Sequence, residues 1–287
     1  MSDPSIPHSQ PSILSRLRSF FFDHPLLLRE VRTRMRGSRT FLIVFVYDFV
    51  LILFMGLVYA GQTSNSSWQY NNVELGRSIF GWVSYAQLVL MLLIAPAITS
   101  ASITTERERH SLDLMGISLL TPREIVWGKL MSSTSFSLIL LLSSVPLIAI
   151  CFMFGGLGPV DLVKTMALTI ASILFFSSMA VFFSAMAKRT VVAVILTFVG
   201  VLTFTLGAPL LLLLTNEIFH WGSKNWLEAA MLISSPFALA TLVMPNEVQS
   251  MSLHKEMWLV HSVIHTGLAA LLLTLAARFV AFPKAKE

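Results

Sequence analysis

The sequence predicts an all-α integral membrane protein with six transmembrane helices, and three observations lead to that prediction. Of the 287 residues, 55% are hydrophobic and 12% are charged, and the mean hydropathy is +0.76. A soluble domain carries about 25% charged residues, and a globule of this length could not bury so much apolar surface. Six apolar stretches are long enough to cross a bilayer, which takes about 20 helical residues. Basic residues are concentrated in the connections that fall on one side of the membrane.

The composition also excludes other classes of protein. One cysteine, Cys151, cannot build a disulfide scaffold, and so apolar a chain is not intrinsically disordered. The net charge of +5 is explained by membrane topology, so we expect no nucleic-acid partner. The segment Met1–Gln10 is polar and has no apolar core, so we expect no cleavable signal peptide there and expect the first span to direct insertion.

The spans are placed where the apolar stretches lie. They are Phe41–Ala60, Ile79–Ser100, Met131–Phe154, Leu162–Ala187, Val191–Thr215 and Met257–Val280. We divide the chain into a polar tail (1–22), a single transmembrane domain (23–280) and a cytoplasmic tail (281–287). Pro96 and Pro146 are expected to kink the second and third spans.

Positive charge sets the orientation of these spans. With the N-terminus in the cytoplasm, 16 basic residues lie inside and four lie outside. The four are Arg77, Lys164, Lys224 and Lys255. Under the positive-inside rule this asymmetry places both termini in the cytoplasm.

The segment Leu227–Met244 is apolar enough to be a seventh span, but a seventh crossing would move the basic tail outside. Pro236 also removes a backbone donor and disfavours helix just before it. We therefore predict a re-entrant hairpin that enters and leaves from the outer face, where surrounding protein covers its backbone.

The first cytoplasmic element is predicted at Asp23–Arg39. Pro25 suits a first helical turn, where its missing N–H costs little. An apolar stripe and a basic stripe lie side by side on this helix: Leu27, Leu28, Val31 and Met35 form the first, and Arg29, Arg32 and Arg36 the second. This pattern is typical of an interfacial helix beside anionic lipid, and the simpler alternative is a topology anchor.

The second element is the connection between spans two and three. Thr105 with Glu108, and Thr121 with Glu124, have capping-box spacing, and Pro122 falls at the first position of the second helix. We expect a short charged helix of about ten residues, then a new helix that runs into the membrane. The alternative is a solvated charged turn.

These two segments, HPLLLREVRTRMRGSRTF and TERERHSLDLMGISLLTPREIVWGK, resemble the ABC-2 type family of ABC transporter permeases. The matching positions are Glu106, Arg107, Glu108, Ser111, Leu112, Asp113 and Leu114, then Thr121, Pro122, Ile125, Gly128 and Lys129. The sequence departs from the pattern at His110, often glycine, and at Asp113, often glutamate. SPFALATL (Ser235–Leu242) is similar to the segment before the family's last span.

The resemblance implies a coupling helix that sits in a cleft of a separate ATP-binding subunit. Its candidate residues are Glu106, Arg107, Glu108, Arg109, Ser111, Leu112 and Asp113. A connecting helix beside it would include Arg29, Glu30, Arg32 and Arg36. The resemblance further implies two permease copies, or two related permeases, with two ATPase subunits, exporting a substrate across a bacterial inner membrane.

The chain itself carries no ATP-binding motif. Its one Gly-Lys pair, Gly128-Lys129, lacks the earlier glycine and is followed by Leu130. We therefore expect no catalytic residue, metal or cofactor in this chain, with ATP and Mg bound by the partner.

Two groups of polar residues in or near the spans have alternative explanations. Asp48 lies about 12 Å into the first span and either faces the pathway or is hydrogen-bonded to a serine or threonine of another span. His254, His261 and His265 fall on one stripe. They are either a zinc or copper site or, more commonly, interfacial histidines without metal.

Two other functions remain open in the sequence. A stand-alone transporter or channel would need no ATPase partner, although no repeat relates the two halves of the chain. A membrane protein that acts only by binding another protein, such as an immunity or assembly factor, would also show no ATP dependence. The substrate is not indicated by any motif.

Overall fold

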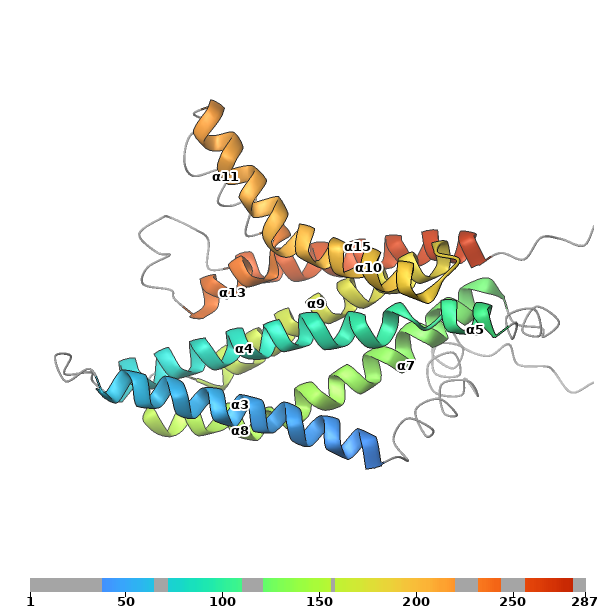
Figure 1. Ribbon diagram of the computed structural model, residues 1–287. Coiled ribbons are helices and arrows are strands. Elements are labelled where there is room, and N and C mark those ends of the chain that lie inside the picture. Colours follow the sequence, from blue (N-terminus) through green and yellow to red (C-terminus); the bar gives the residue numbers. More distant parts are fainter. Residues whose placement is uncertain are drawn as a thin grey trace, which may run out of the picture.

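The computed structural model describes residues 38–64, 72–109, 121–155, 158–219, 232–243 and 256–280 (Figure 1). The described residues form helices and no strands, and six helices are long and apolar enough to cross a membrane. The predicted all-α architecture with six spans is therefore confirmed. The first, second, fourth and sixth spans are formed by α3 (Ser38–Ser64), α4 (Asn72–Ser100), α9 (Pro159–Met186) and α15 (Met257–Val280). The third begins with α7 (Pro122–Ser143) and ends at Phe154, and the fifth begins with α10 (Thr190–Leu202) and ends at Leu212.

The other elements are short. They are α5 (Thr104–Glu108), α8 (Val145–Ala149), η1 (Ile150–Phe154), η2 (Thr203–Gly207), α11 (Ala208–Phe219) and α13 (Ser235–Val243). The third span changes from α7 to α8 at Ser144, two residues before Pro146, as the proline predicts. It also begins at Pro122 rather than at Met131, because the helix opened by Thr121 extends beyond the apolar stretch.

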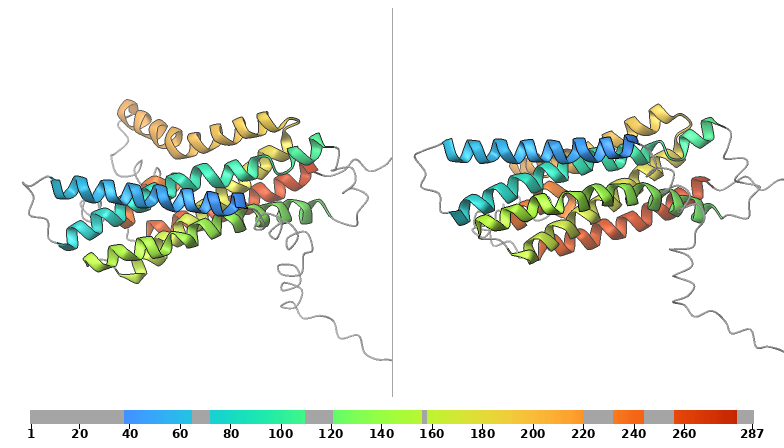
Figure 2. Two further views of the ribbon diagram at one scale, coloured as in Figure 1. Left: turned by 60° about the horizontal axis from the view of Figure 1, so that its bottom comes forward. Right: turned by 90° about the horizontal axis from the view of Figure 1, so that it is seen from below.

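Helix α9 is the centre of the bundle. Of its most apolar stretch 67% is buried, against 11% for α3 and 22% for the fifth span, Thr190–Leu212. It packs against α4, α7, α10, α13 and α15, and α3 lies at the margin of the bundle (Figure 2). The buried face of α9 includes Ala171, Ser172, Ser178, Ala180 and Ser184, small residues that let neighbouring helices approach closely.

The fifth span is interrupted by the π-helix η2, after which α11 turns away from the other spans (Figure 1). A π-helix has hydrogen bonds between residues five apart instead of four, and such bulges are a common cause of sharp kinks in α-helices. The described part of α10 and α11 therefore does not form one straight rod, which the sequence did not indicate.

The predicted re-entrant segment is broken at Ser234, as expected from Pro236. Helix α13 follows the break, and its nine residues span only about 13 Å, too short to cross a bilayer. Three hydrogen bonds hold the break: Ser234 Oγ donates to Thr205 O (2.8 Å), Tyr85 Oη to Pro236 O (3.1 Å) and Ser172 Oγ to Ser235 Oγ (2.9 Å). Tyr85 and Ser172 lie near the middles of α4 and α9, so the break lies at mid-depth of the bundle. The incoming arm before residue 232 lies outside the described residues.

Gly81 permits the close approach of α13 to α4. A Cβ added there would lie 2.2 Å from Val243 Cγ1, and valine has little rotamer freedom to move away. We expect Gly81→Ala to lower the free energy of unfolding by about 1–3 kcal/mol, and Val243→Ala in the same protein to restore most of the loss. Gly56→Ala is the control, because no atom lies within 4 Å of its added Cβ.

Thermal unfolding can be measured with a dye that reacts with thiols. Cys151, the chain's one cysteine, is buried in the folded protein, so the dye reacts with it when the protein unfolds. Equal melting temperatures for Gly81→Ala and Gly56→Ala would contradict the packing argument.

Candidate functional site

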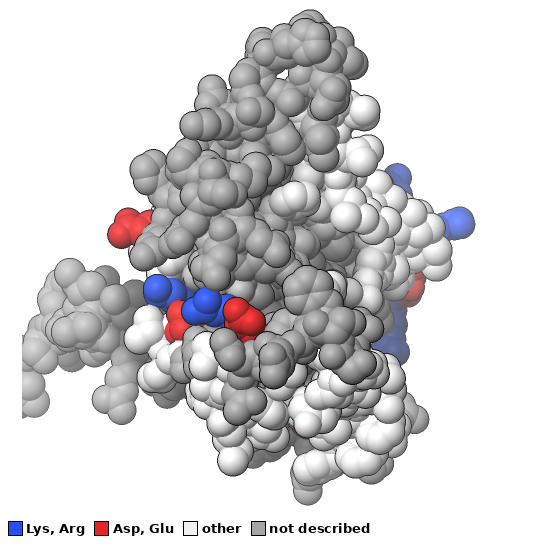
Figure 3. All heavy atoms as spheres, turned by 90° about the vertical axis from the view of Figure 1, so that its left-hand side faces the viewer, with Lys and Arg blue, Asp and Glu red and all other residues white. Residues whose placement is uncertain are grey.

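Apart from Asp48 within α3, the charged residues whose side chains the structure describes lie toward the two ends of the bundle. The end that carries α5 also holds the start of α7, the connection between α9 and α10, and the end of α15 (Figure 1). Its basic residues are Arg107, Arg109, Arg123, Lys129, Lys188, Arg189 and Arg278. The opposite end has few charges, of both signs (Figure 3); they are Glu74, Arg77, Asp161, Lys164 and Glu256. This is the asymmetry that the sequence predicted.

Arg107 fastens α5 to the end of α9. Its Nη1 donates to Ala187 O (2.5 Å) and its Nη2 donates to Ala185 O (3.0 Å). The last carbonyls of a helix have no donor within the helix and carry a partial negative charge, which favours a cation at this place. The guanidinium therefore supplies both the donors and the charge that the end of α9 lacks.

Glu108 makes the complementary contact at the start of α10. Its Oε1 accepts a hydrogen bond from the backbone N–H of Thr190 (2.7 Å), the first residue of that helix. This N–H, with the nearby positive charge of Arg189, holds the pKa of the exposed Glu108 carboxyl below its usual range. A negative charge at a helix N-terminus is stabilising, so Arg107 and Glu108 together match the opposite ends of two consecutive spans.

Glu106 connects α5 to a third span. Its Oε1 lies 2.5 Å from Lys129 Nζ on α7, and the two side chains are 21% and 13% exposed. A charge-assisted hydrogen bond in such a partly buried place is stronger than one in water. Lys129 is therefore part of the site, although its place in the family motif was all that the sequence indicated for it.

The start of α5 differs from the prediction. The N-cap residue is Ile103 rather than Thr105, and no side chain of α5 caps the helix. Instead, Ser184 Oγ on α9 accepts from the backbone N–H groups of Ile103 and Thr104, both at 3.1 Å. The Thr105 capping box is thus wrong, because a neighbouring span satisfies the first amides and Glu108 binds Thr190.

The second predicted capping box is confirmed at the start of α7. Thr121 N donates to Glu124 Oε2 (2.7 Å), and Glu124 N donates to Thr121 Oγ1 (3.4 Å). Pro122 occupies the first helical position, as expected.

The candidate coupling residues thus divide into groups. Glu106, Arg107 and Glu108 contact the chain's own spans, while Arg109 is exposed at the end of α5. The others lie outside the described residues: Ser111, Leu112 and Asp113 of the same segment, and Arg29, Glu30, Arg32 and Arg36 of the predicted connecting helix. Ser184 and Thr190 complete the site, and no spacing in the sequence indicated them.

A family model described as ABC-2 type transporter matches residues 25–247, which include α5, α7 and α13. The chain belongs to the ABC-2 type transporter family. It is the membrane domain, or permease, of an ABC-type transporter, and it is a multi-pass membrane protein. Permeases of this family are typically not enzymes. A search of curated proteins gave no match.

Asp48 of the permease has a partner on another span. Ser143 Oγ on α7 donates to Asp48 Oδ1 at 3.0 Å, and the carboxylate is half-buried on α3. This contact supports the alternative in which a serine satisfies the carboxylate, since a hydrogen bond offsets part of the cost of placing it within a bilayer.

His261 and His265 lie together on α15, as their spacing predicts. Both are fully buried, and their ring centroids are 3.8 Å apart. Nδ1 of His261 lies 2.9 Å from Leu232 O, and Nδ1 of His265 lies 3.1 Å from His261 O. Within the described ranges no three histidine, cysteine or acidic residues are grouped as metal ligands, and His254 lies outside those ranges. A metal site formed by all three histidines, which would include His254, therefore stays a prediction.

The contact between Glu108 and Thr190 should depend on pH. Because the folded carboxyl has a lowered pKa, the contact is complete at neutral pH and is lost as the pH falls through that lowered value. We expect Glu108→Gln to speed amide exchange at the start of α10 by about two- to fivefold at neutral pH, the size of an exposed charge interaction.

Hydrogen exchange with mass spectrometry would measure this effect, with Glu74→Gln at the opposite end as the control. The wild type and Glu108→Gln should converge in acid. Equal exchange of the two proteins at neutral pH would contradict the assignment.

Proposed function

We propose that this permease exports a substrate from the cytoplasm of a bacterial cell, across the inner membrane, driven by a separate ATP-binding subunit. The observation that carries the proposal is the fastening of α5 to three spans by consecutive charged residues, in a chain of the ABC-2 family. A helix held in this way can pass a displacement to the membrane domain.

The orientation follows from the charge asymmetry. The α5 end carries most of the basic residues, so we assign it to the cytoplasm, together with both chain termini. The ATP-binding subunit would then meet α5 from the cytoplasm and bind ATP and Mg²⁺. The chain contains no G-x-x-x-x-G-K-[ST] motif of its own.

The coupling path begins where α5 would meet the ATPase. We assign ATPase contact to Arg109, Ser111, Leu112 and Asp113, and assign attachment to Glu106, Arg107 and Glu108. Arg29, Glu30, Arg32 and Arg36 would form the connecting helix beside them. Movement of α5 would pull on α7, α9 and α10 together, because each holds one of the three attachment residues.

The path continues to mid-depth of the bundle. Helix α10 leads into η2, and Thr205 of η2 accepts the hydrogen bond from Ser234 at the break before α13. A shift of α10 would therefore reach the re-entrant segment directly. Two permeases, identical or related, would enclose the pathway, with their re-entrant segments toward its outer mouth.

A stand-alone transporter is the second candidate, because a helix broken at mid-depth is also typical of such proteins. Purification of the tagged chain from its native membrane in mild detergent separates the two. We expect a stoichiometric partner with a P-loop, whose ATPase activity the permease stimulates.

Within that complex, Glu106→Lys should lower the stimulation of ATPase activity by about threefold or more. The reason is that two positive charges, on α5 and α7, would then face each other. Glu106→Lys with Lys129→Glu restores opposite charges and should restore stimulation, and Glu74→Lys at the opposite end is the control. Full stimulation with Glu106→Lys would rule out the attachment role, and the absence of any ATPase would favour the second candidate.

The role of Asp48 can be tested in the same complex. We expect Asp48→Asn to keep transport within about twofold, because the amide oxygen can still accept from Ser143, and Asp48→Leu to reduce folded yield. Transport into inverted vesicles and the yield of monodisperse protein would be measured. Loss of transport by well-folded Asp48→Asn would instead assign the carboxylate to the pathway.

A further inference from the structure

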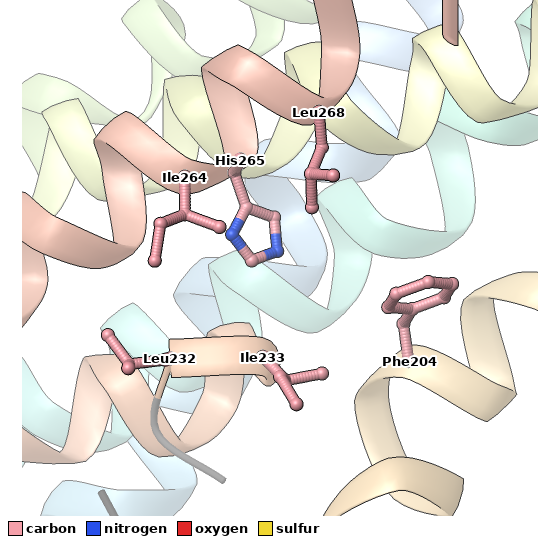
Figure 4. Close-up of a pocket in the computed structure, with 6 residues that line it drawn as sticks. All are labelled: Phe204, Leu232, Ile233, Ile264, His265 and Leu268. Atoms are coloured by element: carbon pink, nitrogen blue, oxygen red, sulfur yellow. The ribbon is translucent and has the colours of Figure 1, made fainter. Parts of the chain in front are cut away.

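A small apolar cavity lies beside the break in the re-entrant segment. Its volume is about 260 Å³. The lining residues are Phe204 of η2, Leu232 and Ile233 just before the break, and Ile264, His265 and Leu268 of α15. Figure 4 shows the imidazole of His265 pointing from α15 into the space between the other side chains. The cavity thus joins a π-helix, a helix break and one buried polar group, features that are often found at functional sites.

The hydrogen bonding of His265 defines what the cavity offers a ligand. The side chain is 1% exposed, and its Nδ1 faces the backbone carbonyl of His261 at 3.1 Å. A carbonyl oxygen accepts only, so Nδ1 carries the proton, and Nε2 of the neutral ring is an acceptor. This Nε2 has no hydrogen-bond partner among the residues that the structure describes, and it is itself fully covered, so an occupant of the cavity reaches it only when the imidazole turns toward the cavity.

An unpaired acceptor in such a place is destabilising unless something binds it. Water is a poor candidate, because a buried water needs two to four polar partners and the other five lining side chains are apolar. An apolar molecule with one hydroxyl group would satisfy Nε2 and also fill the space. The volume suits such a molecule, since it lies between a cavity of about 150 Å³ that holds benzene and the roughly 300 Å³ lower limit of drug-sized pockets.

We propose that this cavity binds a small apolar molecule with a single hydroxyl group, a phenol or a short-chain alcohol taken from the bilayer, whose hydroxyl donates to Nε2 of His265. The occupant would contact Phe204 on one side and Leu232 and Ile233 on the other, next to the hydrogen bond between Ser234 and Thr205. Binding needs no ATPase, so this inference goes beyond the proposed export function and is independent of it.

The test uses the full chain in nanodiscs without an ATPase partner. A phenol that carries a photoreactive diazirine labels the protein, and mass spectrometry locates the label. 4-Propylphenol and propylbenzene then compete at equal membrane concentrations. We expect label on the peptide containing Ile264 and Leu268, and competition about fivefold stronger for the phenol, the effect of one hydrogen bond.

Variants separate the hydroxyl contact from simple filling of the cavity. His265→Leu should abolish the preference for the phenol, and Leu268→Trp should block labelling. Leu271→Trp is the matched control, because Leu271 lies on the same helix, is 53% exposed and does not line the cavity. If Leu268→Trp fails to fold, Ile233→Phe fills the cavity from the other side. Equal competition by the two compounds in the wild type, a preference that survives His265→Leu, or label outside the cavity would overturn the proposal.

Discussion

The structure depends on one constraint, that backbone N–H and C=O groups within a bilayer must find partners in the protein. Regular helix satisfies most of them, and at two departures from regular helix, η2 and the break before α13, a side chain from another segment binds the backbone. At the break before α13, Tyr85 donates to the carbonyl of Pro236 and Ser234 to the carbonyl of Thr205. The break and η2 therefore stabilise each other, which explains how two irregular segments persist in the bundle interior.

The same requirement applies to the helix ends at the α5 side. Arg107 supplies donors to the end of α9, Glu108 supplies an acceptor to the start of α10, and Ser184 accepts from the amides that begin α5. A short helix has little stability of its own, so these contacts determine its position. Three charged residues of the ABC-2 motif, Glu106, Arg107 and Glu108, thus contact the permease's own spans.

Two regions far apart along the bundle share the same helices. Helices α9 and α10 hold α5 at one end, and near mid-depth Ser172 of α9 and Thr205 of η2 hold the re-entrant break. The cavity at His265 adjoins this second region, with Phe204 of η2 in its wall. An occupant of the cavity would contact η2, the segment that the proposed coupling path reaches through α10. Ligand binding and movement of α10 would therefore both act on the contact between η2 and the re-entrant break.

The sequence alone determined the class of protein, the six spans, the charge asymmetry and the break at Ser234, because apolar length, basic residues and proline act locally. It also determined the capping box of Thr121 and Glu124, whose partners are three residues apart. It failed at Thr105, where Ser184, far away in the chain, satisfies the first amides. Only the tertiary structure decided the pairing of Glu106 with Lys129, the contact of Asp48 with Ser143, the π-helix η2 and the cavity at His265. Each of these depends on which helices are neighbours, and hydrophobic pattern within a membrane does not encode that, since lipid-facing and buried positions are both apolar.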